Sequence, residues 1–193
     1  MNLEALVLRL FLNALPPRQL IRIVAETGSQ GRRNRSLPGW LTAYCVLTAS
    51  LLPHLPYRQV AGLLWEEFRE RPIRGAEWNP GPVPTASAIV RARLRLGTDP
   101  LASLLQELSH ARSNGELTLL TSGEGDGPVR TENSVEEKVF LIGHVVGPEA
   151  GTSVDSYGSG LLCFRSRNPL LVEQEIYAYR CIRVLVSSGH SAL

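Results

Sequence analysis

The sequence predicts a mainly α-helical protein: a helical N-terminal domain, then an irregular, glycine-rich segment, then a C-terminal strand and helix. Apolar residues recur at helical spacing as far as Arg112, in stretches separated by prolines and glycines. The pattern stops at Ser113, after which turn-forming residues dominate, with short β-prone runs at 139–146 and 161–164. It returns between residues 169 and 186. We therefore expect three parts, 1–112, 113–160 and 161–193.

Three helices are expected before residue 53. Apolar spacing predicts the first over 3–11, ending before a Pro-Pro pair whose second proline starts a helix over 17–28. Residues 28–35, GSQGRRNR, form a basic loop. The Ser-Leu-Pro sequence that follows caps a third helix over 36–52. This helix is apolar nearly all round, so we expect it at the buried centre.

Three more helices precede the change at Ser113. The fourth begins at Tyr57 and carries its apolar side as far as Phe68. A proline- and glycine-rich connection leads to the fifth, which Thr85 caps and Gly97 ends. Asp99 and the proline after it open the sixth with a cap and a proline at the first helical position.

The fifth helix has a core face and a cationic face. Ile89, Ala92 and Leu96 share one stripe, while Arg91 and Arg95 stand one turn apart on a flank. Arginine is a good helix former, so these side chains could simply form a solvated face. Alternatively, the helix is the second half of a helix-turn-helix-like unit that contacts phosphates or base edges.

The net charge of +2 conceals an uneven distribution. Residues 1–112 hold fourteen arginines, no lysine and eight acidic residues, a net +6, whereas residues 113–160 carry a net −6. Cys45, Cys163 and Cys181 are widely separated and lack zinc-ligand spacing, so we expect small buried side chains in a reducing compartment. We expect neither a signal peptide nor a membrane span.

Three blocks in the first hundred residues resemble the N-terminal domain of transposases of the insertion sequence four family. They are RRNRSLP at 32–38, LLPHLPYRQV at 51–60, and PTASAIVRARLRLGTDPL at 84–101. The resemblance implies a helical domain that precedes a catalytic domain and helps to engage transposon DNA. A second patch, FRSRNPLLVEQEIYA at 164–178, resembles the strand-to-helix segment after the last catalytic glutamate of those enzymes.

The catalytic core that the resemblance implies has no recognisable counterpart in the sequence. Such a core uses two aspartates and a glutamate to hold two metal ions. Asp126 has no strand before it, Glu149 and Asp155 lie among turn-forming residues, and Val184 occupies the expected glutamate position. We therefore expect a truncated transposase-like protein without catalysis and without a cofactor.

DNA binding is the expected function, with double-stranded transposon ends as partner, in a bacterial, cytoplasmic and nucleoid-associated protein. The candidate residues are arginines of the basic loop, the fourth helix and the fifth helix. They are Arg32, Arg33, Arg35, Arg58, Arg91, Arg93 and Arg95.

Three alternatives remain open from the sequence. The middle segment could form a reduced Mg²⁺-dependent nuclease with Asp126, Asp155 and a neighbouring glutamate. The helical domain could pair with an intact transposase and assemble with it or inhibit it. The chain could also be an open reading frame without a selected function.

Overall fold

The computed structural model describes residues 3–29, 37–73, 78, 81–114 and 164–187. These residues contain seven α-helices and no strand, which confirms the mainly α fold class. The expected β-prone run at 161–164 lies almost wholly outside the described residues, and residues 164–168 are irregular. The helices are α1 (Leu3–Ala14), α2 (Pro17–Glu26), α3 (Gly39–Leu51), α4 (Tyr57–Glu70), α5 (Ala86–Leu96), α6 (Asp99–Ser113) and α8 (Pro169–Ser187).

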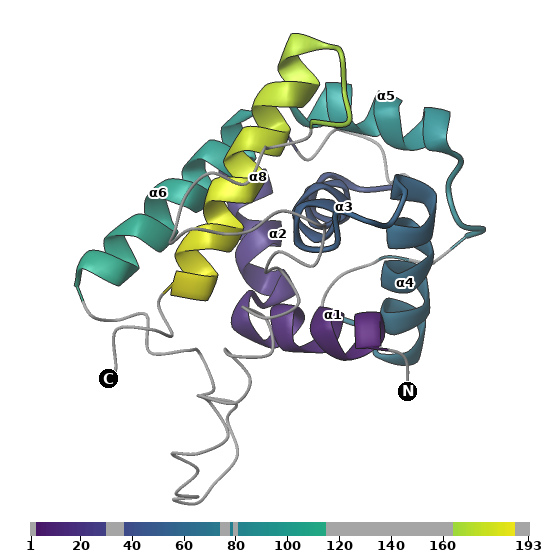
Figure 1. Ribbon diagram of the computed structural model, residues 1–193, viewed down its shortest axis with the longest axis horizontal. Coiled ribbons are helices and arrows are strands. Elements are labelled where there is room, and N and C mark those ends of the chain that lie inside the picture. Colours follow the sequence, from purple (N-terminus) through teal and green to yellow (C-terminus); the bar gives the residue numbers. More distant parts are fainter. Residues whose placement is uncertain (1–2, 30–36, 74–77, 79–80, 115–163, 188–193) are drawn as a thin grey trace, which may run out of the picture.

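Helix α3 lies at the centre of the fold, as its apolar sequence predicts. It is seen nearly end-on in Figure 1, with α1, α2, α4, α5 and α8 arranged around it. Every residue from Trp40 to Ala49 is buried. Trp40 makes edge-to-face ring contacts with Tyr44 and Phe68, at centroid distances of 6.4 and 5.5 Å. A helix buried on all sides organises the other helices as a surrounding layer.

The helix boundaries follow the local signals closely. The Thr85 hydroxyl accepts a hydrogen bond from the Ala88 amide at 3.3 Å, so this residue caps α5 as expected. Gly97 follows the last residue of α5 with φ +71°, a conformation that favours glycine. One cap is corrected: Asp99 is already the first residue of α6, and Thr98 holds the cap position without a side-chain bond.

Helix α8 packs against the helices of the first hundred residues. Its contacts are with α3, α5 and α6, and Ala178, Cys181 and Ile182 belong to the same hydrophobic core as α3. Leu171, Gln174 and Glu175 are also buried, so the inward face of this helix is partly apolar and partly polar. The described part of segment 161–193 therefore shares one core with the N-terminal helices.

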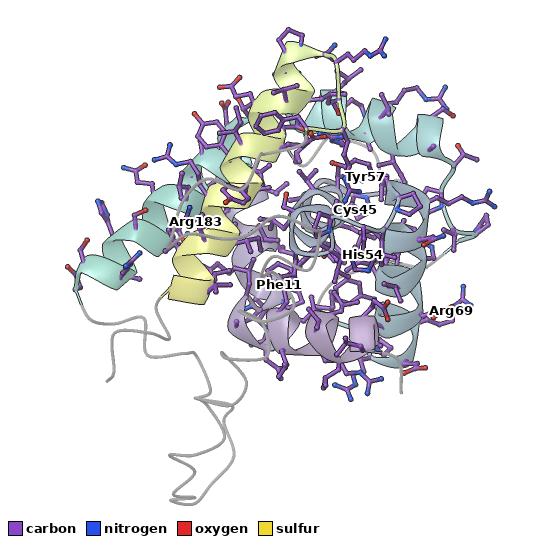
Figure 2. The ribbon with its side chains drawn as sticks, viewed as in Figure 1. Phe11, Cys45, His54, Tyr57, Arg69 and Arg183 are labelled. Atoms are coloured by element: carbon purple, nitrogen blue, oxygen red, sulfur yellow. The ribbon has the colours of Figure 1, made fainter. Side chains whose placement is uncertain are left out.

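Two of the three cysteines have the expected small, buried environment. Cys45 and Cys181 are buried free thiols, and Figure 2 shows Cys45 inside the helical layer. Burial raises the pKa of each thiol to about 12, because a thiolate would lose its hydration there. Cys163 lies outside the described residues.

Ion pairs fix the outer helices to one another. Arg9 of α1 pairs with Glu67 of α4 at 2.9 Å, and Arg22 of α2 pairs with Glu107 of α6 at 2.7 Å. These two arginines are therefore engaged in contacts within the protein. Part of the positive charge of the N-terminal helices is therefore used in ion pairs within the protein. This reduces the number of arginine side chains that can bind a polyanion.

Gly39 allows α2, α3 and α5 to approach one another. A Cβ atom added there would lie 2.7 Å from Val24 Cγ1 and 3.0 Å from the Ser29 carbonyl oxygen. We expect Gly39→Ala to lower the free energy of unfolding by about 1–3 kcal/mol, because the branched Val24 side chain has little room to move. Urea denaturation measures the change.

Gly62 provides the control for this substitution. It lies within α4, and an added Cβ would meet no atom within 4 Å. Gly62→Ala should raise stability by up to about 1 kcal/mol through helix propensity. Equal effects of the two substitutions would contradict the packing role of Gly39.

Candidate nucleic-acid interface

The outer face of α5 presents arginine and aliphatic side chains together. Arg91 and Arg95 are exposed, as expected from their positions one turn apart. Val90 and Leu94 are also exposed, at 41% and 43%. Ile89, together with Ala92 and Leu96, forms the buried stripe. The helix therefore keeps a mixed basic and apolar face outside the core.

Arg93 is a correction to the expected DNA-contacting set. Its side chain is 1% exposed, and its guanidinium donates to Glu175 Oε1 at 3.0 Å and to the Leu171 carbonyl at 2.8 Å. Arg93 is one turn from Ile89 and from Leu96, so it shares their inward stripe. In this structure the side chain cannot reach a DNA backbone outside the protein.

Arg58 lies on the exposed side of the first turn of α4. The guanidinium of Arg93 stacks over the ring of Tyr57, the neighbour of Arg58, with 4.7 Å between Arg93 Cζ and the ring centroid. The first turn of α4 therefore lies against α5. Figure 2 shows Tyr57 at the side of the core nearest α5, whereas Arg69 projects from the outer side of α4. The expected residues Arg32, Arg33 and Arg35 lie outside the described residues.

A polar cluster joins α4, α5 and α8, and the sequence reasoning missed its role. We call it the Glu175 cluster. Glu175 Oε1 accepts hydrogen bonds from Arg93, from the Ser166 hydroxyl at 2.8 Å and from the Tyr57 hydroxyl at 3.2 Å. Its Oε2 accepts from the Arg165 amide at 2.8 Å. The cluster consists of Tyr57, Arg93, Arg165, Ser166, Gln174 and Glu175.

Gln174 satisfies both the side chain and the backbone of α5. Its Oε1 accepts from Arg93 Nε at 3.2 Å, while its Nε2 donates to the carbonyls of Arg93 and Gly97, each at 2.7 Å. These two carbonyls lie at the end of α5, where intrahelical donors run out: the Arg93 carbonyl also accepts from the Gly97 amide, at 3.3 Å. The amide therefore completes the C-terminal turn of α5.

Arg165 performs a similar task at the end of α3. Its guanidinium donates to the carbonyls of Ala49, Leu52, Pro53 and Leu55, at 2.6 to 3.1 Å. A cation at this position also complements the negative end of the α3 dipole. The only signal in the sequence was the polar Gln174-Glu175 pair within a largely apolar stretch, and spacing alone does not assign Arg93 as its partner.

Burial within the cluster affects the protonation of Tyr57. Loss of hydration is the main cause that raises the pKa of its hydroxyl well above the usual value, with opposing influences from Arg93 and Arg165. Tyr57 thus remains a hydrogen-bond donor to Glu175 across the physiological pH range. The cluster is a set of satisfied structural contacts within the described chain.

The acidic residues considered for metal-dependent chemistry belong to the middle segment of the chain. Asp126, Glu149 and Asp155 lie outside the described residues. In the part of the chain that is described, no group of three His, Cys, Asp or Glu side chains could hold a metal ion. Within the same part, no helix has the length and apolarity needed to cross a bilayer.

The geometry defines an all-helical module with a basic outer helix, and comparison with protein families identifies its class. A family model described as the insertion element 4 transposase N-terminal domain matches residues 6–106. The chain belongs to this family, which connects it with DNA transposition. Neither the search of curated proteins nor the search of solved structures gave a match.

Proposed function

We propose that this protein binds the double-stranded DNA of transposon ends through the outer face of α5, and that it does so without cleaving a strand. The observation that carries the proposal is the pair of exposed arginines, Arg91 and Arg95, on a short helix within the family-matched region. Residues one turn apart on one helix face can contact neighbouring phosphates or base edges in a major groove.

Arg58 extends the same basic surface. The first turn of α4 contacts α5 through Tyr57 and Arg93, so exposed Arg58 lies on the turn adjoining α5. Arg32, Arg33 and Arg35 of the basic loop are proposed to add phosphate contacts. Guanidinium groups contribute to DNA affinity mainly by releasing counterions from phosphates, which makes binding strongly dependent on salt.

The exposed aliphatic residues of α5 favour binding in a DNA groove over binding to phosphates alone. Val90 and Leu94 are exposed beside Arg91 and Arg95, and aliphatic side chains on a reading helix can contact thymine methyl groups. In the proposed complex, phosphates position the helix and base edges contact these side chains. The bacterial cytoplasm, at the nucleoid, is the proposed location.

The salt dependence of binding to a duplex of the element's end sequence tests this proposal. We expect the double substitution R91Q/R95Q to reduce the slope of log K against log salt by about 2, or about 0.9 for each lost phosphate contact. Fluorescence anisotropy over a range of salt concentrations measures both slopes. Unfolding curves of both proteins verify that the fold is retained.

Arg69→Gln is the matched control, since Arg69 is an exposed arginine on the outer side of α4 (Figure 2). It should leave the slope unchanged. Binding should persist in EDTA, and Mg²⁺ should produce no nicked product, because the proposal includes neither a cofactor nor catalysis. An unchanged slope in R91Q/R95Q would refute the assignment to α5, and nicking would favour the nuclease alternative.

A further inference from the structure

Helix α5 is fixed to α8 by hydrogen bonds on the side opposite its exposed arginines. The guanidinium of Arg93 donates to Glu175 Oε1 at 3.0 Å and to Gln174 Oε1 at 3.2 Å. Successive residues are about 100° apart around a helix, so Arg93 lies about 160° from both Arg91 and Arg95. The bonds that keep Arg93 inside therefore determine the direction in which the other two arginines point.

Gln174 fixes the end of α5 as well as the Arg93 side chain. It is buried, and its Nε2 donates to the carbonyls of Arg93 and Gly97, each at 2.7 Å. Gly97 also lies where α5 passes into α6, since α6 begins at Asp99. Figure 1 shows the start of α8 beside α5. One buried amide thus bonds to a side chain of α5, to its last turn and to the residue after it.

The apolar stripe of α5 fixes the rotation of the helix less closely than these bonds do. Ile89, Ala92 and Leu96 select the side that faces the core, but apolar contacts are not directional. A hydrogen bond requires a donor–acceptor distance of about 2.7–3.2 Å and a nearly linear geometry. A rotation of about 20° moves a side-chain end about 6 Å from the helix axis by about 2 Å, which breaks such a bond. The polar contacts with α8 therefore determine the rotation of α5 about its axis.

We propose that Gln174 and Arg93 are positioning residues for DNA recognition, because they keep α5 at the rotation in which its exposed arginines read base edges. The inference rests on the proposed function and adds a requirement for segment 164–187, which lies outside the family-matched residues 6–106. Both positioning side chains are buried, so they act through α5 and not by touching DNA. Base readout depends on close placement, whereas attraction to phosphates depends mainly on the number of charges. Loss of positioning should therefore lower the preference for the end sequence more than the general affinity for DNA.

The proposal is tested by the affinities of the full chain for a duplex of the element's end sequence and for a scrambled duplex of equal length. Gln174→Ala changes no charge. We expect it to lower the ratio of the two affinities at least about tenfold, the discrimination that one bidentate base contact provides. The affinity for the scrambled duplex should stay within about twofold, because the number of charges is the same. R93M/E175Q also keeps the net charge, and it should lower the ratio in the same way.

Gln19→Ala is the matched control, since Gln19 donates to Glu107 at 3.2 Å and so links α2 to α6 instead of α8 to α5. It should leave the affinity ratio unchanged. Urea denaturation first establishes conditions in which about 99% of each variant is folded, so that lost stability can lower an apparent affinity by only about 1%. Under these conditions, hydrogen exchange of the α5 amides should be faster in Gln174→Ala than in Gln19→Ala.

An unchanged affinity ratio in Gln174→Ala and R93M/E175Q would overturn the proposal, and so would equal exchange of the α5 amides in the two glutamine variants. Either result leaves the proposed function standing, because the salt slope of R91Q/R95Q tests that function separately. An unsubstituted chain without preference for the end duplex would overturn this inference together with the proposed recognition of transposon ends.

Discussion

Glu175→Ala is expected to lower the free energy of unfolding by about 3–5 kcal/mol, the cost of breaking a buried ion pair from one side. Arg93 is 1% exposed, and the substitution leaves its charge without the carboxylate 3.0 Å away. Three further donors, from Tyr57, Ser166 and Arg165, lose the same acceptor. Small domains are stable by about 5–15 kcal/mol, so this loss should be conspicuous in urea denaturation.

The Glu175 prediction has two internal comparisons. Glu173→Ala, at an exposed site on the same helix, should change stability by no more than about 0.5 kcal/mol. Arg93→Met should cost less than Glu175→Ala, because Glu175 keeps its other donors when the guanidinium is gone. Equal stabilities of the Glu173 and Glu175 variants would show that the cluster contributes nothing to the fold.

The helix boundaries could be predicted from the sequence because the helix ends carry local signals. Pro17 starts α2, Thr85 caps α5 and Gly97 ends it, and each of these acts on its immediate neighbours. The central position of α3 also follows from its own composition, since a helix that is apolar on all sides must be covered on all sides. Each of these features depends on a few residues that are close to one another in the sequence.

The contacts of Arg93 could not be predicted from the residues near it in the sequence. Its position on the stripe of Ile89 and Leu96 indicates an inward direction, but arginine is buried only when partners are supplied. The partners, Gln174 and Glu175, come from a helix far along the chain. Helical spacing identifies the face of α8 that is buried without identifying what lies opposite. The prediction therefore placed Arg93 among the DNA-contacting residues of α5, although its side chain is buried.

The core around α3 gives the other large expected effect. Leu41→Ala should lower the free energy of unfolding by about 3–5 kcal/mol, toward the upper end for such truncations. Leu41 is 0% exposed on a helix that is packed on all sides, so the surrounding helices have little freedom to close the resulting cavity. Urea denaturation with an unchanged m-value would assign the loss to the native core.

Leu94 provides the same chemical change at the surface. It is 43% exposed on α5, and Leu94→Ala should alter stability by only about 0.5 kcal/mol. The two substitutions remove the same atoms from helical positions, so their difference isolates burial from helix propensity. Similar losses at both sites would mean that the outer face of α5 is covered in solution. Since that face is the proposed DNA surface, this outcome would direct attention to a protein partner seated on it.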